Sequence, residues 1–247
     1  MRKFFCLLMA FSLTGCASFQ KEPVKTTAIA LVAMPVGVAL AVPLELLKIV
    51  DEQNRLGPRP LNEQPMYGNQ PKTTAMIQAD KAFLAETEKR GYSHVQGSNM
   101  SVTLGWRYFR ERHDIPTAMK RFNQAWLLDP GNGDAFHGFA VLLMARDRDA
   151  RQAEQLFQRG ITAPRQSPGI WLDYGRFLVM VKKPGEAVAP LRKALTFADM
   201  GPDAEALLTL ALDQSGDHAG ACAERSKIQD GAQAAIRDAA RAVACGT

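Results

Sequence analysis

The chain has 247 residues, of which 47% are hydrophobic and 22% are charged. This is enough for one large domain or two small ones with a sizeable core. The formal net charge is +5, but the basic residues form no long run, and a nucleic-acid-binding surface would need them clustered. The composition therefore predicts a folded protein without a nucleic-acid partner.

Residues 1–15 have the layout of a secretory signal peptide. Arg2 and Lys3 precede an apolar run from Phe4 to Leu13, and small residues follow it. The run is too short to span a bilayer as a helix. Its removal lowers the number of Lys and Arg residues from 30 to 28, against 25 acidic residues, and leaves a net charge of +3.

The end of this segment, Leu13-Thr14-Gly15-Cys16, resembles a bacterial lipobox. The resemblance implies that Cys16 becomes the lipidated first residue of the mature chain, and several acyl chains on one residue make a lasting membrane anchor. Ala17 and Ser18 follow the cysteine. In lipoproteins an aspartate after the cysteine is typical of inner-membrane retention, so the resemblance favours the outer membrane, with the protein facing the periplasm.

Residues 16–72 are expected to hold the anchor, an apolar segment and a linker. Residues 28–44 carry no charged or hydrogen-bonding side chain, and Pro35, Gly37 and Pro43 argue against one regular helix. We consider three environments for this segment: the lipid interface, the domain that follows, or a partner protein. Residues 51–72, with four prolines and two glycines, are typical of an extended linker.

A capping segment is predicted for residues 73–97. Thr73 or Thr74 can cap a helix that runs to about Arg90, where Gly91 supplies the stop. One face of this helix is expected to be apolar and to carry Met76, Ile77, Phe83 and Leu84.

The next 133 residues, 98–230, contain a repeat with a period of 34 to 35 residues. Alanines stand at positions 118, 153, 187 and 221, which are 35, 34 and 34 residues apart. Three further classes of position keep the same spacing: four residues after each alanine come Phe122, Phe157, Leu191 and Arg225; upstream stand the small residues Gly105, Ala140, Gly175 and Thr209; and three residues after these come Tyr108, Leu143, Leu178 and Leu212.

This period and these residue types resemble the tetratricopeptide (TPR) repeat. The resemblance covers residues 98–230 and implies an all-α solenoid of about four helical hairpins. We expect the small residue of each first helix to face the alanine of the second helix, where the backbones cross closely. The larger residues would fill the space between units.

The fourth unit departs from the pattern at Thr209 and Arg225, which suggests the end of the array. Residues 231–247 are predicted to form a C-terminal capping helix with Ile236, Ala240 and Val243 on one face, because repeat arrays need polar ends. Cys222 and Cys245 remain after processing. In an oxidising periplasm they either form a disulfide or stay free and buried.

The resemblance also implies a protein-binding groove lined by the first helices. Carried over position by position, the groove residues are Trp106, Phe109 and Arg110; His137, Val141 and Met144; Leu172, Arg176 and Met180; and Leu210, Asp213 and Gln214. Residues 28–50 could occupy such a groove, which we keep as a hypothesis. The four histidines are scattered, and no nucleophile motif or metal-ligand spacing is present, so we predict no enzyme, no cofactor and no metal site.

The sequence thus predicts an outer-membrane lipoprotein whose TPR solenoid is an adaptor for envelope proteins, such as those of a pilus, a secretion system or a cell-wall enzyme complex. Two alternatives stay open. One is an immunity or inhibitor lipoprotein that binds a single secreted effector. The other is an integral membrane component that uses residues 28–44 as a span.

Overall fold

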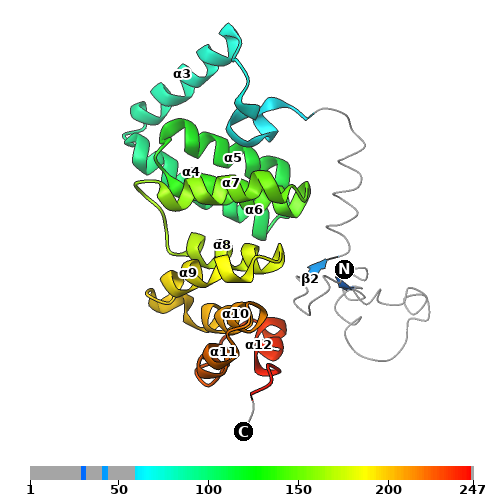
Figure 1. Cartoon of the computed structure of the whole chain (residues 1–247). Coiled ribbons are helices and arrows are strands. Elements are labelled where there is room, and N and C mark those ends of the chain that lie inside the picture. Colours follow the sequence, from blue (N-terminus) through cyan, green and yellow to red (C-terminus); the bar gives the residue numbers. More distant parts are fainter. Residues whose placement is uncertain (1–28, 32–40, 44–58, 246–247) are drawn as a thin grey trace, which may run out of the picture.

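The computed structural model describes residues 29–31, 41–43 and 59–245. In this part of the chain ten α-helices form an elongated stack, shown in Figure 1. Their bounds are α3 (Thr74–Lys89), α4 (His94–Arg110), α5 (Ile115–Leu128), α6 (Gly133–Arg146), α7 (Ala150–Thr162), α8 (Gly169–Met180), α9 (Pro184–Ala194), α10 (Gly201–Gln214), α11 (His218–Arg225) and α12 (Ala234–Arg241). Three short 3₁₀ helices accompany them: η2 (Leu61–Glu63), η3 (Pro65–Asn69) and η4 (Ala198–Met200).

Two three-residue strands, β1 (Ile29–Leu31) and β2 (Ala41–Pro43), pair in antiparallel register, with Ala30 opposite Val42. They lie at the two ends of the segment whose prolines argued against one regular helix. The signal peptide, Cys16 and the rest of residues 28–44 lie outside the described residues. Among the helices that are described, none combines the length and the apolar character of a membrane span.

The body of the molecule is a stack of four helical hairpins: α4 with α5, α6 with α7, α8 with α9, and α10 with α11. The two helices of each hairpin contact each other extensively, and the first helix of each following hairpin packs against both helices of the hairpin before it. The predicted all-α TPR-type solenoid is confirmed. The first of these helices begins at His94, four residues before the boundary expected at residue 98.

The repeating alanines lie inside the stack, since all four are completely buried. The atoms nearest to two of the small first-helix residues belong, however, to the larger side chain four positions after the alanine. A methyl group added at Gly105 would come within 2.8 Å of the Phe122 ring, and one at Gly175 within 2.5 Å of Leu191. Phe122 also reaches the next unit, where a methyl group at Gly138 would lie 2.3 Å from its ring. The small residues therefore make room for the large side chain four positions after the alanine.

The turns inside the hairpins repeat as well. His113, Arg148, Lys182 and Gly216 all have positive φ angles, of 52°, 54°, 62° and 93°. In three of the four turns the next residue is an aspartate that caps the second helix, and Asp114, Asp149 and Asp217 each accept a hydrogen bond from a backbone N–H of the first turn. The left-handed residue reverses the chain, and the aspartate starts the next helix.

Helix α3 lies at the amino-terminal end of the stack (Figure 1). Thr73 caps it by accepting a hydrogen bond from the N–H of Met76, and Gly91 follows it with a φ of 82°. Met76, Phe83 and Leu84 are half-buried, but Ile77 is 43% exposed. Ile77 stands seven residues before Leu84 and so lies on the same side of the helix, but its position near the start of α3 leaves its side chain less covered.

The described part of the predicted linker is not extended. Residues 59–70, which we call the strap, form η2 and η3 and pack against α5. The cause is Asn123, which is completely buried: its amide donates to the carbonyls of Asn62 (3.0 Å) and Gln64 (2.8 Å) and accepts from the N–H of Tyr67 (3.3 Å). The buried Arg146 adds a bond of 2.8 Å to the carbonyl of Glu63. Prolines here start turns instead of extending the chain.

The carboxyl-terminal end is closed by α12 and by a disulfide between Cys222 and Cys245. Ile236, Ala240 and Val243 are buried, as expected, although α12 itself is shorter than the predicted helix. Arg225, which stands where the other units carry phenylalanine or leucine, donates a hydrogen bond of 2.8 Å to the carbonyl of Val243. Arg225, the residue at which the fourth unit departs from the repeat pattern, thus bonds the segment that follows α12.

Candidate protein-binding face

The predicted groove residues lie on α4, α6, α8 and α10, the first helices of the four hairpins. Consecutive first helices contact one another along the stack. Together these side chains form what we call the first-helix face. One polar or aromatic contact links each helix of this face to the next.

The link between α4 and α6 is aromatic. The ring of Trp106 packs edge-on against the ring of His137, with 4.8 Å between the centroids, and against Phe122 at 5.2 Å. The guanidinium of Arg110 lies over the Trp106 ring, 4.6 Å from its centre. Cation–π contacts of this kind stabilise by about 0.5–1 kcal/mol at exposed sites.

The link between α6 and α8 is a hydrogen bond of 2.9 Å between His137 Nε2 and Asp173 Oδ2. His137 is only 3% exposed, so this contact lies inside the face and not on its surface. Burial alone would raise the pKa of Asp173. The hydrogen bond and charge of His137, with the charges of Arg176 and Arg110, outweigh burial and hold the pKa of this carboxyl below its usual value.

The link between α8 and α10 is an ion pair. Arg176 donates to Asp173 Oδ1 (2.6 Å) on its own helix and to Asp203 Oδ2 (3.0 Å) on α10. The other oxygen of Asp203 accepts a hydrogen bond of 2.7 Å from the N–H of Gln233, which precedes α12. A chain of contacts therefore runs from Trp106 across all four first helices to the carboxyl-terminal cap.

The structure divides the predicted groove residues into two classes. His137, Leu172 and Leu210 are buried among the core side chains. Arg110 is exposed, and the others are half-buried, so their side chains are open to a partner: Trp106, Phe109, Val141, Met144, Arg176, Met180, Asp213 and Gln214. The structure brings His137 and Arg176 into hydrogen-bond contact with one carboxylate, that of Asp173, on which the charge of Arg110 also acts.

Sequence reasoning missed Asp173 and Asp203, the two carboxylates that join the units. A signal for the first was present, since Asp173 and Arg176 are three residues apart on one predicted helix and such residues are neighbours on a helix surface. No comparable signal marks Asp203, whose contact with Arg176 spans 27 positions in the sequence.

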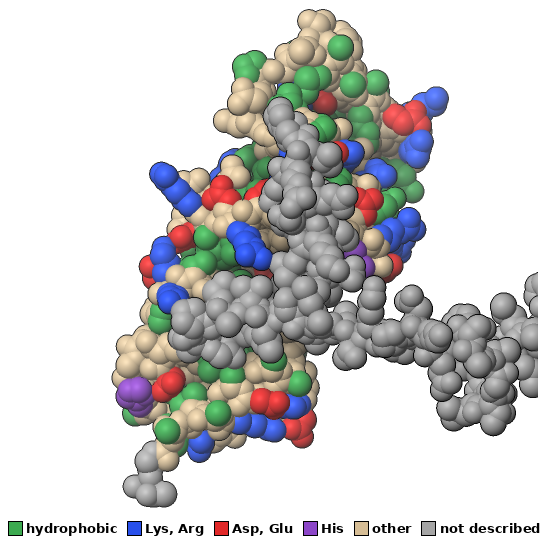
Figure 2. Space-filling model, turned by 90° about the vertical axis from the view of Figure 1, so that its right-hand side faces the viewer, with side chains coloured by type: hydrophobic (Ala, Val, Ile, Leu, Met, Phe, Trp, Pro, Cys, Tyr) green, Lys and Arg blue, Asp and Glu red, His purple; other side chains and the backbone are tan. Residues whose placement is uncertain are grey.

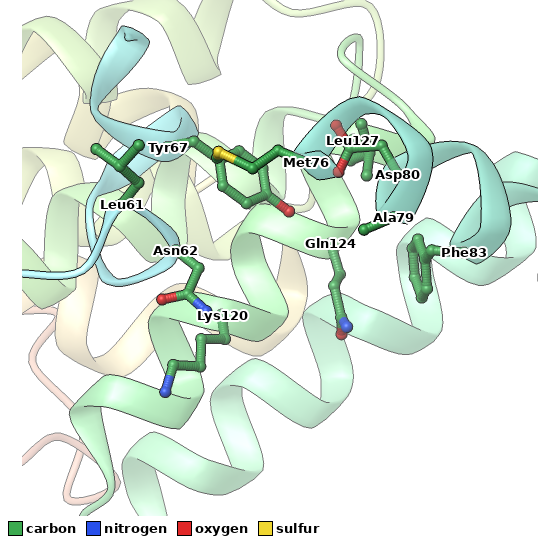
Figure 3. A pocket seen from close by; sticks show the side chains of 10 residues that line it. All are labelled: Leu61, Asn62, Tyr67, Met76, Ala79, Asp80, Phe83, Lys120, Gln124 and Leu127. Atoms are coloured by element: carbon green, nitrogen blue, oxygen red, sulfur yellow. The ribbon is translucent and has the colours of Figure 1, made fainter. Parts of the chain in front are cut away.

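A pocket of about 550 Å³ lies elsewhere, between the strap, α3 and α5 (Figure 3). Its charged side chains already have partners: Asp80 pairs with Lys72, and Lys120 with Glu63 at 2.8 Å. Burial and the charge of Asp80 raise the pKa of Tyr67 in this pocket to about 12. The lining residues include none of the first-helix face: Leu61, Asn62, Tyr67, Met76, Ala79, Asp80, Phe83, Lys120, Gln124 and Leu127.

Figure 2 shows one side of the molecule, on which basic and acidic side chains lie interspersed among hydrophobic ones. Over the described residues, no group of three or more His, Cys, Asp and Glu side chains is arranged to hold a metal ion.

No family model matches the sequence, and no curated protein matches it. Among solved structures, the chain is similar to YrrB, described as a TPR protein with an unusual peptide-binding site. The identity is 18%, the match covers 65% of this chain and 75% of that chain, and the TM-score is 0.46. The assignment of the fold therefore rests on the stacked hairpins themselves and on their 34- to 35-residue period.

Proposed function

We propose that the protein is an interaction scaffold that binds a segment of another protein on its first-helix face. The observation that carries this proposal is the line of contacts from Trp106 to Asp203, which crosses all four units and leaves a partly open surface beside it. That surface combines an aromatic side chain, methionines and arginines, the residue types enriched where binding energy concentrates in protein interfaces.

The repeat architecture supports a scaffold for a second reason. Each unit contacts its neighbours mainly, so the array presents an extended surface instead of an enclosed cleft. The three linking contacts hold the four units in register, and a bound segment would meet preformed side chains. Preformed surfaces bind more tightly, because less conformational entropy is lost on binding.

The proposal also includes an anchor. The lipobox-like sequence supports lipidation of Cys16 and placement on the outer membrane, facing the periplasm, and the partner is then an envelope protein. An adaptor role in a pilus, secretion or cell-wall machine fits such a position. Metabolic labelling with an alkyne fatty acid tests this directly: label that is absent from a Cys16→Ser variant supports the anchor, and an unlabelled wild-type protein contradicts it.

The binding proposal is tested by capturing partners from native membranes with the full-length protein. The test variant carries Arg110→Glu and Met144→Glu on the first-helix face. The control carries Arg151→Glu and Gln155→Glu, two exposed positions on the second helix α7, and it changes the net charge by the same amount. Partners lost only from the test variant support the proposal. Equal capture by both variants would place the binding surface elsewhere.

A further inference from the structure

The two ends of the stack are closed differently. Repeat arrays need end units with a polar outer face. At the carboxyl-terminal end α12 supplies such a face: it buries Ile236 and exposes Asp238 and Arg241. At the other end α3 projects from the stack (Figure 1), and its contact with α4 is much smaller than the contact between the two helices of any hairpin. Much of the surface of α3 is therefore left without a partner helix in the described part of the chain.

Large hydrophobic side chains are exposed at this amino-terminal end. The described residues contain four of them, all on α3, on α4 or in the turn between these helices: Ile77, Tyr92, Val95 and Met100. Single exposed apolar residues scattered over a surface are normal, but a group of them confined to one end of the molecule indicates an interaction site. The group contains no residue of the first-helix face, so the proposed function does not explain it.

The exposed isoleucine of α3 belongs to a stripe that also carries charges. Ile77, Lys81, Leu84 and Glu88 are 4, 3 and 4 residues apart, and residues at this spacing lie on one side of a helix. Tyr92 comes 4 residues later, just beyond the end of α3. Along this line, which we call the α3 stripe, apolar, basic, apolar, acidic and apolar side chains follow one another.

Both charged side chains of the α3 stripe are exposed and can bond a partner. Lys81 forms no ion pair within the described residues. Glu88 lies 3.0 Å from His94 through one carboxylate oxygen, and its second oxygen has no hydrogen-bond partner among the described residues. A partner segment with the opposite charges can therefore pair with each of them.

The order of side chains in the α3 stripe is complementary to itself. When a second α3 lies antiparallel to the first, with a twofold axis beside Leu84, Lys81 of each copy faces Glu88 of the other, and Ile77 lies toward Tyr92. A parallel copy would set Lys81 against Lys81, and like charges destabilise such a contact. An interface that pairs one surface with itself across a twofold axis is the commonest kind in soluble oligomers.

We propose that the protein forms a homodimer through α3, with the α3 stripes of two copies in antiparallel contact. The apolar side chains at the centre and ends of each stripe lose water in this contact and supply most of the stabilisation. The two pairs of Lys81 with Glu88 set the orientation, because exposed ion pairs give specificity more than affinity. The interface includes no residue of the first-helix face, so each copy keeps that face open.

Sedimentation equilibrium of the full-length protein, in a detergent matched to the density of the solvent, measures this association. The wild type is expected to show a monomer–dimer equilibrium below about 100 µM, as weak protein interfaces do. Lys81→Glu and Glu88→Lys each place like charges at both pairs, because the twofold axis repeats every contact, and each should raise the dissociation constant about tenfold. An equimolar mixture of these two variants should associate as the wild type does, since a glutamate then faces a lysine at both pairs.

Arg151→Glu, at an exposed position on α7, is the control, because it changes the net charge by the same amount as Lys81→Glu. It should associate like the wild type. Two misfolded variants could not restore association when mixed, so the mixture also controls for folding. A wild type that stays monomeric at about 100 µM overturns the proposal and leaves this end of the stack for another protein. A dimer that tolerates both single reversals, or a mixture that associates as weakly as the single variants, overturns the α3 interface.

Discussion

At the scale of single residues, the left-handed position in each hairpin turn shows how backbone geometry limits the choice of side chain. Only the fourth turn uses glycine, at Gly216; the first three turns accept His113, Arg148 and Lys182. A side chain in this region costs about 1–2 kcal/mol, because its Cβ approaches the carbonyl oxygen. The first three turns bear this cost.

Gly216→Ala is therefore expected to lower the free energy of unfolding by about 1 kcal/mol, measured by urea denaturation. No atom lies within 4 Å of the methyl group that the substitution adds, so the effect comes from the backbone alone. Gly201→Ala is the matched control: no atom lies within 4 Å of the added methyl group there either, but Gly201 has a helical φ of −52°. The control should be neutral or slightly stabilising, and an equal loss in both variants would refute the backbone explanation.

Asp173 makes stability depend on pH. Its pKa in the folded protein is held below the usual value for an aspartate, so the ionised form is stabilised by folding. This contribution is fully present above the unfolded pKa of about 3.9 and is lost as the pH falls through the lower folded value. The stability of the wild type should fall below about pH 4.

Asp173→Asn keeps the shape of the side chain and removes the charge, so it is expected to lower stability at pH 7 and to flatten the acid slope of thermal unfolding midpoints. Asp199→Asn, at an exposed position in η4, controls for the change in net charge. An unchanged slope in Asp173→Asn would show that other carboxylates cause the acid sensitivity.

At the scale of elements, the strap depends on one buried side chain. Asn123 supplies all three of its hydrogen bonds to the strap backbone. Asn123→Ala leaves two carbonyls and one N–H of residues 62–67 without these bonds, so stability should fall by about 2–3 kcal/mol. Hydrogen exchange and proteolysis should increase at residues 59–70, while the exchange of α8 to α12 stays unchanged. Gln229→Ala, which alters an exposed amide between α11 and α12, should change neither.

The sequence predicted the four hairpins because each depends on contacts that recur with the repeat period. Phe122 and Phe157 occupy equivalent repeat positions, so the packing expected in one unit is also expected in the next. The strap follows no such rule. Asn123 bonds residues about 60 positions away. Nothing in the repeat pattern indicates that its amide forms hydrogen bonds with the backbone of another segment. By sequence alone the prolines in residues 51–72 therefore indicate a linker, although Pro65 is buried at the start of η3.

The candidate face was predicted in part for the same reason. The repeat register places Trp106, His137 and Arg176 on the first helices, and they do lie together. The register gives helix positions but not depth, so it did not separate the buried His137 from the exposed Arg110. The register also does not predict a role for Asp203. Its contact with Arg176 depends on how far the two side chains extend between α8 and α10, which the repeat spacing does not give.

At the scale of the whole molecule, a stack of repeats is stabilised locally, because each unit contacts only its neighbours. The disulfide between Cys222 and Cys245 closes 23 residues that include α12. In the chain-entropy model a loop of this size contributes about 3 kcal/mol. The effect should be concentrated at the carboxyl-terminal end, where α12 packs on α10.

Changing both cysteines to alanine is therefore expected to lower the free energy of unfolding by about 3 kcal/mol and to increase hydrogen exchange in α10, α11 and α12. Exchange in α4 and α5 should not change, because two whole units, α6 with α7 and α8 with α9, separate them from the unit that carries Cys222. Arg225→Gln in the same protein should add to the loss, since the bond to the Val243 carbonyl also holds the segment after α12. A uniform increase in exchange along all ten helices would contradict local stabilisation and would show that the stack unfolds as one cooperative unit.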